Sequence, residues 1–476
     1  MKRHRYIHIL AIVATLGAAG SPAAHAADGV TAPERPLPDR WTYTEAYRQT
    51  APAADDWWAT FGDPMLDSLL VKAQANNYNV AAAIKRIDLA RKETDLARSA
   101  YWPDLQASAG WQKAQTAGAT THPSTPSRRV DYLSLGLNMN WEIDVFGRVS
   151  ANIKAGKAAT QAARADYDAV LVSLAANVAK AYFRLRTLQE QHAVALSHIQ
   201  QQEKVLRMTE ARFEAGIGDM LEVTQARIVL YSTKSTLPQL EAEIRTQASA
   251  LAVLTGEYPA TLAPTLLRPA PLPAEGAMPD VGIPADLLRR RPDIVAAEKE
   301  VARLAAEAGV ARKDFLPTLS LQGSIATDSH DIDGLFGSHS LTYSVAPTLT
   351  WTIFDGLARN YRLAEARLQT EAAIDSYNLT VLNAVEEVEN ALSSYYAQRH
   401  TAALLADLVE ESRKSVDLAV DRYKNGLSAF TNVVDALMSY LENQNSYVAA
   451  RGSTLAALVT LYQALGGGPG GMTEQQ

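Results

Sequence analysis

Residues 133–142 read LSLGLNMNWE, and this short stretch decides the fold. Every odd position carries Leu, Met or Trp, and every even position carries a small or polar residue. A period of two predicts a β-strand with one apolar face. The same alternation recurs in three other stretches, 105–112, 319–325 and 341–351.

Strands of about ten residues with this alternation fit a transmembrane β-barrel. A soluble sandwich with one buried face is the alternative. It is disfavoured because the neighbouring helical stretches are too long to fold back over such small sheets. The loops 113–131 and 326–340 are also polar, as external barrel loops are.

Four strands cannot close a barrel, because small single-chain barrels begin at eight strands and open edges are not tolerated in lipid. Two copies would give eight strands and three would give twelve. The even-numbered face holds Ser, Asn, Thr, Gly and Gln, which suits a wet lumen and favours three copies. Trp111, Trp141 and Trp351 lie near strand ends, where they are expected at the membrane interface. Pro347 interrupts the last strand and predicts a bulge.

Outside the strands the apolar period changes to that of helices. Residues 148–215 contain no proline and one internal glycine, Gly156, and their apolar residues are spaced as in heptads. A helix of about 65 residues would be about 100 Å long. Residues 357–424 repeat this pattern, and each stretch ends at a glycine, which favours a helix C-cap. Returning helices complete two hairpins, with Asp219 and Glu222 predicted as a capping box for the first and Ser428 as N-cap of the second.

The chain is an internal duplication with an offset of 210 residues. Trp141 corresponds to Trp351, and RFEAG at 212–216 corresponds to RYKNG at 422–426. We therefore predict an α+β protein with this division: a signal peptide at 1–26, an N-terminal equatorial segment at 27–66, a first repeat at 67–256 (strands about 104–142, hairpin 148–255), a Pro-rich connector at 257–285, a second repeat at 286–466 (strands about 317–352, hairpin 357–465) and a flexible tail at 467–476.

Composition excludes several classes of protein. The formal charge of −7 argues against nucleic-acid binding. The chain has no cysteine, so disulfide scaffolds, thiolate metal sites and a lipidated cysteine are excluded. No spacing typical of metal ligands, cofactor loops or catalytic groups is present, and we expect no cofactor, no metal and no enzymatic activity.

The N-terminus is typical of a secretory signal. Lys2, Arg3 and Arg5 precede an apolar stretch at 7–20, and Ala24-His25-Ala26 fits a cleavage site. An N-terminal membrane anchor is the alternative, but the stretch is short for a span. No later stretch is apolar for long enough to form a transmembrane helix.

The sequence resembles the TolC-like outer-membrane factors, specifically the NodT/OprM-type efflux proteins. The resemblance covers nearly the whole mature chain, and it is carried by Trp57-Trp58 with 61–64, by Trp141–Asp144 with 146–148, by 287–294, by Trp351–Gly356 and by the two R-[FY]-x-x-G motifs. It implies a homotrimer with a 12-stranded barrel, continued by an α-helical barrel and a mixed equatorial belt. Many relatives carry a lipidated N-terminal cysteine that this chain lacks.

The function that the resemblance implies is a passive exit duct in the outer membrane, extending into the periplasm. An inner-membrane pump would supply the energy through a periplasmic adaptor, and the cargo would be drugs or other small toxic molecules. A type I protein-secretion duct is the alternative with the same fold. A trimeric coiled-coil adhesin and a periplasmic enzyme are more distant alternatives.

The resemblance also implies two sites in the hairpins. Tip residues would receive the adaptor, although the glycines could serve the turn alone; these residues are Arg212, Gly216, Val223, Arg422, Gly426 and Val433. Asn432 and Asp435 would form a periplasmic gate, with a ring of Asp435 side chains around the axis. The alternative for Asp435 is a carboxylate that stabilises a helix N-terminus. For Arg289-Arg290-Arg291, a solvated helix start before Pro292 is favoured over an anion site.

Overall fold

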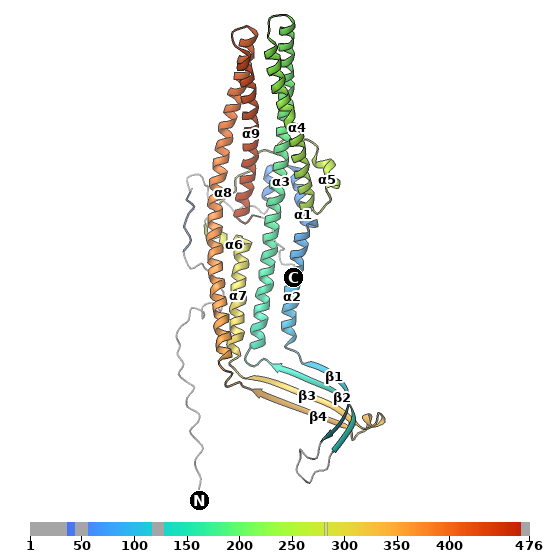
Figure 1. Cartoon of the computed structure of the whole chain (residues 1–476). Coiled ribbons are helices and arrows are strands. Elements are labelled where there is room, and N and C mark those ends of the chain that lie inside the picture. Colours follow the sequence, from blue (N-terminus) through green and yellow to red (C-terminus); the bar gives the residue numbers. More distant parts are fainter. Residues whose placement is uncertain (1–35, 43–55, 117–127, 280, 283, 468–476) are drawn as a thin grey trace. The chain divides into compact units, whose positions relative to one another are not determined.

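The computed structural model describes residues 36–42, 56–116, 128–279, 281–282 and 284–467 (Figure 1). The predicted signal peptide, much of the N-terminal segment and nearly all of the predicted tail lie outside these residues. The chain divides into two compact units. Of the described residues, those within 90–161 and 298–377 form the first unit, and those within 36–89, 162–297 and 378–467 form the second.

The first unit contains a four-stranded antiparallel sheet in the order β1-β2-β3-β4. Its strands are β1 Asp104–Thr116, β2 Arg128–Ile143, β3 Thr318–Ser329 and β4 Leu341–Thr350. The register aligns Ala107 with Leu137, Leu137 with Ile325 and Ile325 with Tyr343. Directly paired residues share a face, so the apolar positions form continuous rows on one side of the sheet.

The predicted bulge at Pro347 is wrong. Pro347 pairs one-to-one with Leu321, and the register continues without a break on both sides. β4 is an edge strand, where proline is tolerated because one side of the strand has no neighbour in the sheet.

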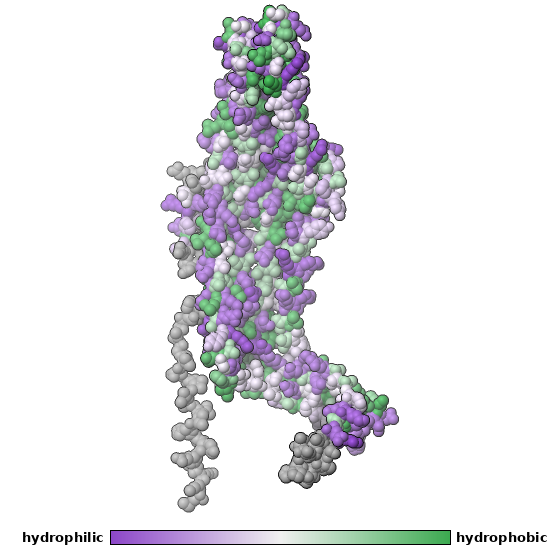
Figure 2. Space-filling model, viewed as in Figure 1, coloured by the Kyte–Doolittle hydropathy of each residue, from purple (hydrophilic) through white to green (hydrophobic). Residues whose placement is uncertain are grey.

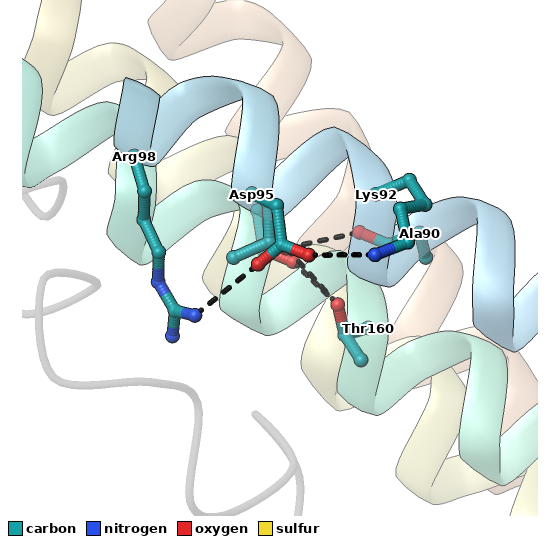
Figure 3. A network of polar contacts seen from close by, with 7 residues as sticks. Ala90, Lys92, Asp95, Arg98 and Thr160 are labelled. Carbon is teal, nitrogen blue, oxygen red and sulfur yellow. Dashed lines mark hydrogen bonds and ion pairs between the residues drawn. The ribbon is translucent and has the colours of Figure 1, made fainter. Parts of the chain in front are cut away.

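Helices α2 (Tyr78–Ser99) and α7 (Pro292–Lys313) precede the two strand pairs and have 22 residues each. Within the first unit, α2 contacts the start of α3 (Arg148–Glu214) through the Thr94 and Thr160 hydroxyls, 3.1 Å apart (Figure 3). On the exposed side of α2, Asp95 accepts hydrogen bonds from Lys92 at 3.2 Å and Arg98 at 3.3 Å. Gly156 allows this close approach, because a Cβ at this position would lie 3.2 Å from the Thr94 backbone.

The long helices predicted from the sequence are present. α3 and α8 (Ala358–Lys424) have 67 residues each, and α4 (Met220–Leu254) and α9 (Phe430–Ala464) have 35 each. Equal lengths in both halves reflect the 210-residue offset of the sequence. No helix in the described ranges is both long and apolar enough to cross a membrane.

The core of the second unit is aromatic at its centre. Trp57, in the short helix η4 (Trp57–Phe61), stacks on Tyr462 of α9 with ring centroids 5.0 Å apart, and Phe61 packs against Phe183 of α3 at 4.9 Å. Helix α1 (Pro64–Asn76) follows directly, and Asp63 caps it by accepting a hydrogen bond from the Met65 amide at 2.9 Å. The WW-x-x-FGDP motif therefore fixes the N-terminal segment to the long helices.

The Pro-rich connector is anchored to the helices by side-chain donors. It contains helix α5 (Pro259–Leu266) and leads into the short turn η6 (Pro284–Asp286), and the described residues between them form no helix or strand. Gln189 donates to the Leu266 carbonyl at 2.9 Å, and Tyr462 donates to the Ala277 carbonyl at 2.8 Å.

The expectation of a solvated arginine before Pro292 is wrong for Arg291. Arg291 follows α6 (Leu287–Arg290), and its side chain is buried. It pairs with Asp293 and with Glu387 of α8, each at 2.6 Å, and donates to the Ala464 carbonyl at the end of α9 at 3.1 Å. A buried cation needs such partners, and this one joins α7, α8 and α9.

Candidate functional site

The two hairpin tips have the same backbone turn, 210 residues apart. Gly216 and Gly426 have φ of +72° and +70°, a conformation that favours glycine. At each tip the amide of the residue after the glycine donates to the carbonyl of the arginine five positions earlier: Ile217 to Arg212 at 3.0 Å and Leu427 to Arg422 at 2.8 Å.

The returning helices begin differently from what the sequence predicts. Asp219 caps α4 by accepting from the Leu221 amide at 3.1 Å, but Glu222 does not complete the capping box. Its carboxylate instead accepts a hydrogen bond from Tyr423. The prediction of Ser428 as N-cap of α9 is wrong, because the N-cap is Ala429, which has no capping side chain. Ser428 accepts a hydrogen bond from the Asn432 side chain at 2.7 Å.

A cluster of Arg212, Glu222 and Tyr423 joins the two tips, and we call it the tip cluster. The Arg212 guanidinium lies over the Tyr423 ring, 4.9 Å from its centre, and the Tyr423 hydroxyl donates to Glu222 at 2.6 Å. Burial and this hydrogen bond raise the pKa of Tyr423 to about 12. The ring packs on Phe430 at 5.1 Å, so polar contacts and apolar packing hold the hairpins together.

The predicted tip residues divide into buried and accessible groups. Val223 and Val433 are fully buried, and Val433 lies in the apolar core beneath the tips. Gly216, Arg422 and Gly426 are exposed, and Arg212 is half-buried in the tip cluster. Val223 and Val433 therefore hold the hairpins together and offer no surface to a partner.

Sequence reasoning missed a set of exposed apolar side chains at the tips. Figure 2 shows hydrophobic surface among hydrophilic residues at the end of the two hairpins. These exposed residues are Phe213, Ile217, Met220, Leu221 and Leu427. Their signal was available, because large apolar residues flank both tip glycines where a solvated turn would carry polar ones.

The predicted gate residues Asn432 and Asp435 are exposed and line one open groove between α8 and α9. Arg422 and Lys414 line the same groove. Asp435 is the sixth residue of α9, beyond the first turn, where the helix dipole acts most strongly. Stabilisation of the helix N-terminus is thus a weak explanation for this carboxylate.

The three predicted interface tryptophans mark two levels of the sheet. Trp141 and Trp351 donate from their indole nitrogens to the carbonyls of Tyr101 and Phe315, at 3.0 and 3.1 Å. Trp111 pairs with Leu133 on β2, eight residues from Trp141 (141 − 133). At about 3.4 Å per residue these levels are about 27 Å apart, close to the apolar band of about 25 Å on outer-membrane barrels.

Among the described residues, no group of three or more His, Asp or Glu side chains could hold a metal ion. The buried polar contacts described above join helices to one another. They form a structural framework around the hairpins and the connector.

Comparison with known proteins identifies the family. A sequence model of the family described as outer membrane efflux protein matches residues 69–257 and 283–467, once in each half related by the 210-residue offset. The chain is 30% identical over 460 residues to the pyoverdine export outer membrane protein OpmQ of Pseudomonas aeruginosa, with 95% of this chain and 94% of that protein covered. It is 29% identical over 442 residues to the toluene efflux pump outer membrane protein TtgI of Pseudomonas putida, with 92% and 93% covered.

The fold agrees with a solved channel. The outer-membrane channel OprN superposes with a TM-score of 0.83 at 32% sequence identity, covering 92% of this chain and 98% of that chain. The chain therefore belongs to the outer membrane efflux protein family and is an outer-membrane channel of an efflux system.

Proposed function

We propose that three copies of this chain form one exit duct, with a 12-stranded barrel in the outer membrane and the hairpins forming a helical tunnel in the periplasm. Each copy would contribute its four strands (3 × 4 = 12). The duct is passive and has no enzymatic activity of its own. An inner-membrane pump energises it through a periplasmic adaptor.

The observation that carries this proposal is the sheet itself. Its apolar face is solvent-exposed in the single chain, including Leu105, Leu137, Ile325 and Val345, and β1 and β4 are both open edges. Unpaired backbone groups cost several kcal/mol each in lipid, so a membrane-embedded sheet of this kind must close with other copies. The even-numbered residues would then face the lumen.

Adjacent residues of β3 test the arrangement. The chain has no cysteine, so Ser324→Cys and Ile325→Cys each introduce a unique thiol. In vesicles, a charged, water-soluble thiol reagent should modify Ser324→Cys and leave Ile325→Cys unmodified. Equal modification of both thiols, or a monomer in cross-linking of the purified protein, would refute the barrel.

The tips are proposed as the adaptor-docking surface. The exposed apolar side chains around Gly216 and Gly426, together with Arg422, provide a surface that another helical protein can bury. Replacing Ile217 and Leu427 by Asp should abolish co-purification of the adaptor. The matched control replaces Leu368 by Asp, an exposed residue of α8 in the other unit.

The proposed cargo is small organic molecules. Among the relatives, OpmQ is named for pyoverdine export and TtgI for toluene efflux. A deletion strain should become more sensitive to solvents or drugs, and a plasmid copy should restore resistance. Loss of an exported protein with unchanged sensitivity would favour the secretion alternative.

A further inference from the structure

The connection between β3 and β4 folds back onto the sheet. It contains the short turn η7 (Asp333–Phe336), which contacts β2 and β3. Three features fix it: His330 contacts the Asp131 carbonyl of β2, the Ser340 hydroxyl donates to the Gly334 carbonyl at 2.6 Å, and Leu335 is buried. The turn is therefore an ordered part of the sheet's surface.

A groove of about 500 Å³ lies between this turn and the strands. Phe336 lines it, together with Ala107, Ala109, Leu135, Leu137 and Ile325. The register pairs Ala107 with Leu137 and Ala109 with Leu135, and these are the apolar rows of the sheet. The other lining residues are mostly small, so apolar side chains dominate the groove. The turn thus lies over the apolar face.

The turn also exposes large apolar side chains. Phe336 is 84% exposed and Ile332 is 69% exposed, on a connection that also carries Asp331 and Asp333. Exposing large apolar side chains to water is unfavourable, and polar residues would serve equally well in a solvated connection. On the face that would meet lipid, Phe336 and Ile332 would lose contact with water.

We propose that this groove binds an acyl chain of an outer-leaflet lipid, with Phe336 and Ile332 inserted into the membrane beside it. The proposal rests on the proposed barrel. The groove spans the two apolar rows next to the row of Trp111, at the end of the sheet away from the helices. The occupant is lipid because the groove is continuous with the apolar face.

A single thiol tests the insertion. Phe336→Cys, labelled with an environment-sensitive fluorophore, is reconstituted in phosphatidylcholine vesicles with and without brominated acyl chains. We expect loss of fluorescence with brominated lipid and no loss with aqueous iodide. Quenching by iodide would show that the turn lies in water. Protection from both quenchers would show contact with another copy. Either result overturns the proposal.

Two controls separate this proposal from the barrel. Val345→Cys, on the apolar face outside the groove, should be quenched by brominated lipid, and Ser324→Cys, on the polar face, by iodide. If these controls behave as expected and Phe336→Cys does not, the lipid site alone fails. If the controls fail, the barrel arrangement fails.

A substitution that fills the groove tests whether the groove binds an acyl chain. Ala109→Phe adds a ring at the floor of the groove and should reduce the number of lipids retained per protein in native mass spectrometry. Ala346→Phe, at a residue in register with Gln322 on the opposite face, is the matched control and should retain the lipids. Equal retention by both variants would contradict the acyl-chain site.

Discussion

At the scale of single residues, Arg291 shows how a motif fixes several helices at once. The buried guanidinium has two carboxylate partners and one carbonyl partner, and these come from three helices. Gly466 has φ of +77°, and a Cβ there would lie 2.8 Å from the Arg290 carbonyl. The end of α9 thus packs directly on the chain that precedes α7.

Arg291→Met should destabilise the protein by about 3 kcal/mol, the lower end for breaking a buried ion pair, because Asp293 and Glu387 stay partly exposed. The measurement is a guanidinium titration of the detergent-solubilised protein. Arg399→Met is the control, since Arg399 is 57% exposed and pairs with Glu275 at 3.5 Å. It should cost less than about 1 kcal/mol. Equal losses in the two variants would contradict the structural role of Arg291.

Tyr423→Phe should lower the free energy of unfolding by about 1–2 kcal/mol, because it removes the hydrogen bond from Tyr423 to the Glu222 carboxylate. The pKa of Tyr423 is raised to about 12 from 10, so its contribution is fully present below pH 10 and is lost as the pH rises towards 12. The midpoint temperature of thermal unfolding should therefore decrease more steeply between pH 8 and 12 in the wild type than in Tyr423→Phe. Tyr231→Phe, at an exposed position of α4, is the control and should follow the wild type.

At the scale of elements, the sequence predicts the strands and helices, because these depend on the local spacing of apolar residues. It fails for features that depend on a partner distant in the sequence. Alternation was sufficient for the four strands, and heptad spacing with terminal glycines was sufficient for the hairpins. The bulge at Pro347 was wrong because the sequence does not show that β4 is an edge strand. The capping box at Glu222 failed because Tyr423, from the other hairpin, takes its carboxylate.

The two faces of β4 should respond differently to charge. Tyr343→Lys places an ammonium group on the apolar face, in register with Ile325 and Leu137 and midway between the two tryptophan levels, where it costs about 2–4 kcal/mol near the middle of a bilayer. It should reduce the fraction of protein in the outer membrane. Ser344→Lys, one residue away on the polar face, should be tolerated. The measurement is membrane fractionation. A similar decrease of the outer-membrane fraction in both variants would mean that lipid does not contact one face of β4 in preference to the other.

At the scale of the whole molecule, the proposed function depends on surfaces that three copies of the chain would complete. The sequence predicts docking and gate residues near the tips, but it does not distinguish buried Val433 from exposed Asp435, two residues apart on α9. The orientation of α9 about its own axis determines which of its residues are buried. This orientation follows from the packing of Val433 with Tyr423 and Phe430. The exposed face of α9 that carries Asp435 is therefore set by the apolar core on its other side.

Asp435→Ala should make the channel leaky. In the proposed trimer three Asp435 carboxylates would surround the axis, where a ring of acidic side chains favours cations. Removing them should increase conductance in planar bilayers and lower the preference for cations. Glu442→Ala, at an exposed acidic residue of α9 that does not line the groove, should keep both properties. Because both substitutions remove one charge per copy, a difference between them reports position and not net charge. Wild-type conductance and selectivity in Asp435→Ala would exclude this residue from the gate.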